Sequence, residues 1–165
     1  MFREMRRFKQ KLKEDKVDEI LEKSSSGVLS LIGDEGYPYG VPLSYAYTEN
    51  KLIFHTAKTG HKIDAIKNNS KASFTIIEKD QIVPEEYTTY FRSAILFGKV
   101  KIIEDRNLKL KYIKILSEKY SIPGDPGQYE EIDKLFEKFE MIEFQIEHKS
   151  GKEAKELANK QKSQG

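Results

Sequence analysis

Short apolar runs alternate with turn residues along the chain, and this pattern predicts an antiparallel sheet interrupted by helices. Strands are expected over six ranges, namely 27–33, 37–47, 52–56, 71–78, 88–104 and 141–147. Residues 79–86 are expected to form a loop, and Gly98 is the expected bend of the longest strand. Six strands with one short helix between them and a later pair of helices indicate a small barrel or sandwich with helices attached.

Four helices are expected between the strands, each with an apolar stripe on one face. Asp15, Thr59 and Asp105 are the expected N-caps of the first three, and the fourth is expected over 129–140. The helix after Thr59 is short, because its stripe consists of Ile63 and Ile66 before the run of asparagines.

The second expected strand, YPYGVPLSYAY, contains two prolines. Pro38 and Pro42 cannot donate ladder hydrogen bonds, so this strand is expected to be an edge, bulged, or interrupted where something other than a strand approaches. Gly40 between them permits a close backbone approach. The strand is therefore interpreted either as a wall for a flat ligand or as a simple edge, and the pattern leaves both open.

The stretch LIFHTAKTGHK places polar groups between the end of a buried strand and the start of a helix. His55 and Thr56 end the strand, and Thr59, His61 and Lys62 lie around the first helical turn. A lysine there opposes the helix dipole unless an anion rests on the same end. Taken alone, Lys62 fits a side chain pointing into water, His55 fits a packed strand-end histidine, and His61 fits a surface residue. Their clustering favours a phosphate site.

The length and charge of the chain limit the number of domains and the kinds of partner that are expected. The 165 residues are assigned to one domain, 1–165, with a basic arm at 1–14 and a tail at 153–165 that is expected to be frayed. Charged residues make up 34% of the chain but nearly cancel to a net charge of +2. That balance describes a solvated surface and predicts no nucleic-acid partner.

Composition also narrows the chemistry and the compartment. Cysteine is absent and only three histidines occur, so no disulfide, no cysteine nucleophile and no dedicated metal site are expected. No apolar run approaches the roughly 20 residues that cross a bilayer, and the first residues lack the apolar core of a signal peptide. The expectation is a cytoplasmic protein without a membrane partner.

Four segments in this order resemble one known family. They are PYGVPLSYAY, IFHTAKTGHK with the helix that follows, TYFRSAILFGKV, and the closing strand that leads to Ser150-Gly151-Lys152. Together they resemble the pyridoxamine phosphate oxidase-like FMN-binding split barrels, and within them the nitroimidazole-resistance branch. The resemblance extends from about Met5 to Lys155.

The resemblance implies a mainly β fold, an antiparallel split β-barrel with flanking helices, that forms a homodimer with FMN at the subunit interface. Thr56, His61 and Lys62 match the positions that hold the flavin phosphate, and His55 with Thr56 matches the cofactor contact at the strand end. Further positions counted as cofactor-binding are Val41, Pro42, Leu43 and Ser44 along the isoalloxazine, Thr59 at the phosphate corner, and Ser93 with Arg92 on the long strand. Arg92 fits a surface charge equally well.

Two departures from the family pattern limit what is carried over. The basic residues that hold the vitamin phosphate in the oxidase proper are replaced here by VPLS and QIEHKSGKE, so oxidation of pyridoxamine phosphate is not expected. His61 stands where the branch usually has arginine, and a histidine is a weaker, titratable contact. Looser FMN binding is the expected consequence.

The resemblance implies an FMN-dependent oxidoreductase that reduces a small, flat, electron-poor molecule such as a nitroimidazole. His55 is the candidate catalytic residue, as a proton donor to the reduced substrate. One alternative is a flavin-binding or sensing module without turnover, because no Gly-rich nicotinamide-binding turn is present. Another is a split barrel that binds a different planar cofactor, such as haem or a deazaflavin.

Overall fold

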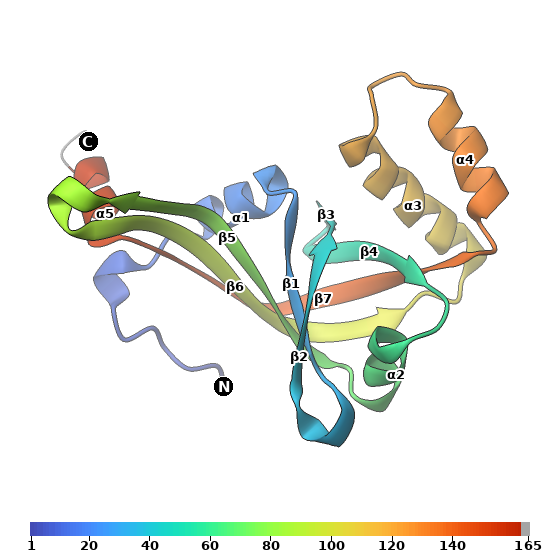
Figure 1. Ribbon diagram of the computed structural model, residues 1–165, viewed down its shortest axis with the longest axis horizontal. Coiled ribbons are helices and arrows are strands. Elements are labelled where there is room, and N and C mark those ends of the chain that lie inside the picture. The colour runs from blue at the N-terminus through green and yellow to red at the C-terminus, as the bar shows by residue number, and fades with distance from the viewer. Residues whose placement is uncertain (163–165) are drawn as a thin grey trace.

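The computed structural model describes residues 1–162 (Figure 1). Fifteen elements follow one another in that range. In chain order they are η1 (Phe8–Gln10), α1 (Glu14–Lys23), β1 (Ser26–Ile32), η2 (Asp34–Gly36), β2 (Pro38–Ser44), β3 (Ala46–Thr48), β4 (Lys51–Ala57), α2 (His61–Asn68), β5 (Lys71–Val83), η3 (Pro84–Glu86), β6 (Thr88–Ile102), α3 (Arg106–Tyr120), α4 (Gly127–Leu135), β7 (Phe139–Glu153) and α5 (Lys155–Lys162). None of these helices is long and apolar enough to cross a bilayer.

All seven strands form one antiparallel sheet in the order β2-β1-β5-β6-β7-β4-β3. The two outermost strands, β2 and β3, are joined in the chain by Tyr45 alone. The sheet must therefore curl until its two edges meet, although the ladder is interrupted at that point. The expected antiparallel split barrel with flanking helices is confirmed.

Two apolar layers form because β-strand side chains alternate between the faces of the sheet. The barrel interior is filled by residues such as Leu29, Phe54 and Phe74, which are fully buried. The outer face of β4 and β7 carries Ile53 and Met141, and this face is covered by α3 and α4. The alternation in β4 therefore places Thr56 with Phe54 on the inner side and His55 with Ile53 on the helix-covered side.

Three helix boundaries differ from the sequence-based expectation. The N-cap of α1 is Lys13 instead of Asp15, whose carboxylate accepts from the backbone of the next residue. The N-cap of α2 is Gly60 instead of Thr59, because the chain turns there with a φ of 120° that only glycine adopts readily. The fourth helix ends at Leu135, since Phe139 already pairs with Ala57 as the first residue of β7.

Two stretches expected to be irregular are regular. Residues 79–83 continue β5 after a bulge and pair with 88–92, so the expected loop shrinks to η3. The expected frayed tail is wrong over 153–162, because Glu153 ends β7 and α5 follows it. Glu153 is only 3% exposed and accepts from Arg92, which shows that one face of this charged stretch is packed. Residues 163–165 lie outside the described part.

The N-terminal arm is packed against the end of β7. The backbone of Leu12 donates to Gly151 O at 2.9 Å, and the buried Gln10 side chain donates to Glu153 O at 3.0 Å. Phe2 stacks on His148 with ring centroids 4.8 Å apart. The arm is thus partly helical, as η1, and only in part solvated.

Replacing Asp105 by alanine is expected to lower the free energy of unfolding by about 1 kcal/mol. The Asp105 carboxylate caps α3 by accepting from the backbone N–H of Leu108 at 2.7 Å, as the sequence predicted. Urea denaturation measures the effect. Asn107→Ala, at an exposed position in the same first turn, is the matched control, and an equal loss in both variants would contradict the capping role.

Candidate functional site

The expected anion corner is formed where β4 leads into α2. Lys62 Nζ donates to Thr56 Oγ1 at 2.9 Å, and Thr56 is only 8% exposed. The first intrahelical bond of α2 runs from Asp64 N to Gly60 O, so the three backbone N–H groups before it have no partner within the helix. A hydroxyl, an ammonium and a helix N-terminus therefore meet at one place, and this set suits a phosphate.

Burial perturbs the two titratable groups of this corner. Desolvation lowers the pKa of Lys62. The pKa of His55 is lowered from its usual 6.5, first by desolvation and then by the nearby Lys62 ammonium. His55 is therefore neutral at neutral pH, and an anion bound at Lys62 would offset part of the repulsion that lowers its pKa.

Replacing Lys62 by glutamine is expected to raise the pKa of His55 while leaving it below 6.5. The ammonium repulsion disappears, but desolvation, which is the larger cause, remains. A proton NMR titration of the three imidazole Cε1–H signals measures this shift. Lys67→Gln on the same helix is the control, and an unchanged His55 titration in Lys62→Gln would contradict the coupling.

His61 and Thr59 are turned away from this pair. His61 Nε2 accepts from the backbone N–H of Asp34 at 3.3 Å, and its ring stacks on Tyr39 with centroids 4.1 Å apart. The histidine thus packs on the turn between β1 and β2, while Thr59 is exposed in the bend before α2. The structure does not join either residue to the Thr56–Lys62 pair, and their contact with a phosphate stays a prediction.

The proline-containing strand β2 is an edge strand, one of the alternatives that the sequence left open, and its pairing with β1 is unbroken at both prolines. It pairs with β1 on one side and stops at Ser44, one residue before β3. Pro42 and Ser44 are exposed on the outer face, while Val41 and Leu43 are half-buried. Four residues were expected to lie along the isoalloxazine ring. Of these, Pro42 and Ser44 have side chains that are exposed on the outer face.

A cavity of about 390 Å³ lies between the sheet and the α3–α4 pair, and we call it the hairpin cavity. Ser44 and His55 line it from the sheet, and its apolar lining comes from Ile113, Leu116, Ile132, Leu135 and Phe139. Sequence reasoning missed this site because the helical apolar residues read as core. The signal available was that such residues lie on both sides of the turn at 123–126.

Tyr120 fixes the sheet side of the hairpin cavity. Its hydroxyl accepts from Tyr45 N at 3.0 Å and lies 2.8 Å from Tyr45 O, and it also contacts Ser25 O. The end of α3 is thereby bonded to the single residue that links β2 to β3. This contact holds Ser44, the neighbour of Tyr45, at the cavity edge.

Arg92 and Ser93 lie far from the corner within one chain. On β7, Thr56 is opposite Glu140 and Arg92 is opposite Glu153. Glu153 comes thirteen positions after Glu140, which corresponds to roughly 40 Å along the strand at about 3.3 Å per residue. Figure 1 shows α5 and the β5–β6 hairpin at one end of the molecule and α2 at the other. Arg92 also donates to Glu153 from Nε at 3.2 Å and from Nη2 at 3.1 Å, so it forms a structural ion pair.

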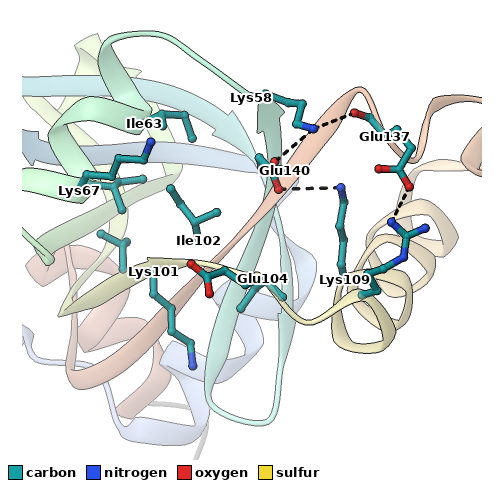
Figure 2. Close-up of a pocket in the computed structure, with 13 residues that line it drawn as sticks. Lys58, Ile63, Lys67, Lys101, Ile102, Glu104, Lys109, Glu137 and Glu140 are labelled. Atoms are coloured by element: carbon teal, nitrogen blue, oxygen red, sulfur yellow. Dashed lines mark hydrogen bonds and ion pairs between the residues drawn. The ribbon is translucent and has the colours of Figure 1, made fainter.

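A larger cavity of about 610 Å³, shown in Figure 2, is lined by Ile63, Ile66 and Lys67 of α2 and by residues of β6, α3 and β7. Three of its cations are paired with its glutamates: Lys58 and Lys109 lie 3.9 and 3.8 Å from Glu140, and Arg106 lies 2.6 Å from Glu137. Lys101 lies 3.2 Å from Glu143, and Lys67 has no ion pair in the described part of the chain. Because most of its cations are already neutralised, it suits an anion less well than the Lys62 corner does. Within residues 1–162 no cluster of acidic, histidine or cysteine side chains could hold a metal ion.

Comparison of the sequence with known protein families identifies the family to which this chain belongs. The family described as pyridoxamine 5'-phosphate oxidase matches residues 13–153. The chain belongs to the pyridoxamine 5'-phosphate oxidase family. The resemblance inferred from the four sequence segments is thereby confirmed, and the matched range includes β1 to β7. Among curated proteins, no match is found.

Solved structures share the fold of this pyridoxamine 5'-phosphate oxidase family member. A candidate 5-nitroimidazole antibiotic resistance protein from Bacteroides thetaiotaomicron is 21% identical, with a TM-score of 0.70 over 86% of this chain and 85% of that one. A conserved hypothetical protein from Mycobacterium tuberculosis is 18% identical, with a TM-score of 0.78 over 92% of each chain. The flavocytochrome Anf3 from Azotobacter vinelandii is 18% identical, with a TM-score of 0.75 over 91% and 72%.

Proposed function

We propose that this protein is an FMN-dependent oxidoreductase that reduces a small, flat, electron-poor molecule such as a nitroimidazole. The observation that carries the proposal is the hydrogen-bonded Thr56–Lys62 pair at the start of α2. Thr56 is the chain neighbour of His55, which lines the hairpin cavity. FMN, when bound, supplies the electron-transfer chemistry, and the protein positions the reactants. Flavin binding by this family member agrees with similar structures named as a flavocytochrome and as a FAD-binding protein.

Residues of this chain fit the phosphate of FMN at one end and its isoalloxazine ring at the other. Lys62 and the Thr56 hydroxyl, with the backbone N–H groups of the first turn of α2, would hold the phosphate. The desolvated ammonium of Lys62, whose pKa is lowered by burial, would gain a counter-charge there, and that charge would raise its pKa. Pro42 and Ser44 on the outer face of β2 would lie along the ring, and the proline leaves no N–H at its own position.

His55 is proposed to donate a proton to the reduced substrate. Because its pKa lies below 6.5, the imidazolium fraction rises only as the pH falls through that lowered value, so a step that needs the imidazolium speeds up toward acid pH. His55→Ala should keep its flavin and lose about 10²-fold in turnover, together with this pH dependence. His148→Ala, far from the cavity, is the control. Full turnover in His55→Ala would remove the assignment.

A second copy in the proposed homodimer explains why the predicted cofactor-binding residues lie in two separate places on one chain. Ser93 lies on β6, opposite Lys152 near the end of β7, and is too far away to reach a flavin held at Lys62 of the same chain. The outer face that carries Ser93 also exposes Val28, Ile77 and Ile95 on three adjacent strands, and such contiguous apolar surface is typical of an interface. A second copy on this face would bring its own Ser93 toward the corner.

Light scattering tests the dimer. The proposal expects a mass near twice the 19.2 kDa of one chain. Ile95→Lys should give monomers with weakened FMN binding, because a charge is placed within the face. Ile122→Lys, at a more exposed position on the turn between α3 and α4, is the control. A monomer that binds FMN tightly would contradict the proposal.

A haem-binding barrel is the second candidate, because similar structures include a flavocytochrome and a FAD and heme binding protein from Mycobacterium smegmatis. The absorption spectrum of the purified protein separates haem from flavin. A flavin-binding module without turnover is distinguished by stopped-flow mixing with NADH or NADPH. Rapid loss of the yellow colour supports the enzyme, and no reduction supports the module.

A further inference from the structure

The charged side chains that line the hairpin cavity are limited to one carboxylate. No lysine or arginine lines it, and its one carboxylate is Glu131, on the exposed side of α4. Within residues 1–162, the side chain of Glu131 makes no hydrogen bond or ion pair. Its charge is therefore not neutralised by the protein, in contrast to Glu137 and Glu140 of the larger cavity in Figure 2.

Other polar groups of the cavity are neutral, and several already have partners. Ser117 Oγ donates to Gln128 Oε1 at 3.2 Å, and the Tyr120 hydroxyl bonds the backbone of Tyr45. The pKa of His55 lies below 6.5, so this side chain adds no charge at neutral pH. The cavity thus combines apolar walls with a single negative charge, and no group in it balances an anion.

We propose that the hairpin cavity binds the substrate ring and that Glu131 determines charge specificity, favouring cationic and neutral aromatic molecules over anionic ones. The volume of about 390 Å³ suits one small aromatic molecule. The identification of the occupant as the substrate rests on the proposed function, because Ser44 and His55 face the same cavity. Selection operates by repulsion, since a carboxylate or phosphate entering this space meets Glu131 and loses its hydration without gaining a cation.

Three probes of one shape and different charge test the inference. They are 4-nitrobenzylamine, 4-nitrobenzyl alcohol and 4-nitrobenzoate, titrated without an electron donor by equilibrium dialysis at pH 7.5 and low ionic strength. The amine is expected to bind at least about threefold more tightly than the benzoate, because an exposed charge changes affinity by factors of this size. Glu131→Gln should reduce this preference, and Glu131→Lys should reverse it.

Two further variants make the result specific to the cavity. Glu130→Lys makes the same change in net charge at a neighbouring residue that does not line the cavity, and it should leave the order of the probes unchanged. Leu135→Trp, at a partly exposed lining position of α4, should fill the space and weaken all three probes. Equal binding of amine and benzoate by the unmodified protein, or equal effects of Glu130→Lys and Glu131→Lys, would overturn the inference.

Failure of this inference is distinguishable from failure of the proposed function. FMN is titrated into the same protein preparations in parallel. If FMN does not bind but the probes follow the expected order, the cavity keeps its specificity and the oxidoreductase proposal falls. If FMN binds and the probes show no charge preference, the role of Glu131 falls and the flavin site stands.

Discussion

Lys62→Ala is expected to weaken FMN binding by roughly 30- to 150-fold, which corresponds to about 2–3 kcal/mol for a lost hydrogen bond between charged groups. The ammonium lies beside Thr56 at the positive end of α2, and it has no acidic partner within residues 1–162. An anionic phosphate would supply that partner. Quenching of flavin fluorescence during titration measures the affinity of each variant.

Lys67→Ala is the matched control for this result. Lys67 lies on the same helix, but it is exposed and lines the larger cavity of Figure 2 instead of the corner. Its removal changes the net charge by the same amount and should change FMN affinity less than about twofold, because exposed charges contribute little. Equal losses in the two variants would mean that general electrostatic attraction, and no specific phosphate contact, holds the cofactor.

Gly98→Ala is expected to lower the free energy of unfolding by about 3 kcal/mol or more. A Cβ at this position would lie 2.0 Å from the carbonyl oxygen of Gln145 and 3.1 Å from Phe144 Cζ. The first of these is backbone of β7, at the point where the β6–β7 register shifts, so neither strand can yield without breaking the ladder. Urea denaturation of the FMN-free protein measures the loss.

The comparison for that result is Gly40→Ala on the edge strand. An added Cβ there meets only Val28 Cγ1, at 3.2 Å, and this methyl group can shift. The expected loss is below about 1 kcal/mol, as for substitutions that meet a single mobile group. If Gly98→Ala and Gly40→Ala unfolded at the same urea concentration, the close contact between β6 and β7 would be refuted.

The sequence predicted those parts of the site that depend on local order. Thr56 and Lys62 are six residues apart, and the strand end and the helix start that position them are both visible in the pattern of apolar residues. The direction of His61 was not predictable in this way, because it depends on Asp34 and Tyr39, which reach α2 only after the barrel has closed.

Long-range packing also explains the errors in the fold. The last strand was expected to end at residue 147, because the residues that follow are mostly charged. Glu153 is nevertheless buried, since Arg92 from β6 and Gln10 from the N-terminal arm both bond to it. A charged residue that finds such partners cannot be distinguished from a solvated one by composition alone. The hairpin cavity was missed for a related reason, since Leu116 and Ile132 read equally well as core.

The most direct test of the account is the absorption spectrum of the protein after it is mixed with FMN and passed through a desalting column. We expect flavin bands that elute with the protein at about one FMN per chain, and a loss of these bands in Lys62→Ala under the same conditions. Protein that elutes without flavin, or that retains as much flavin in Lys62→Ala as in the unmodified chain, would contradict it.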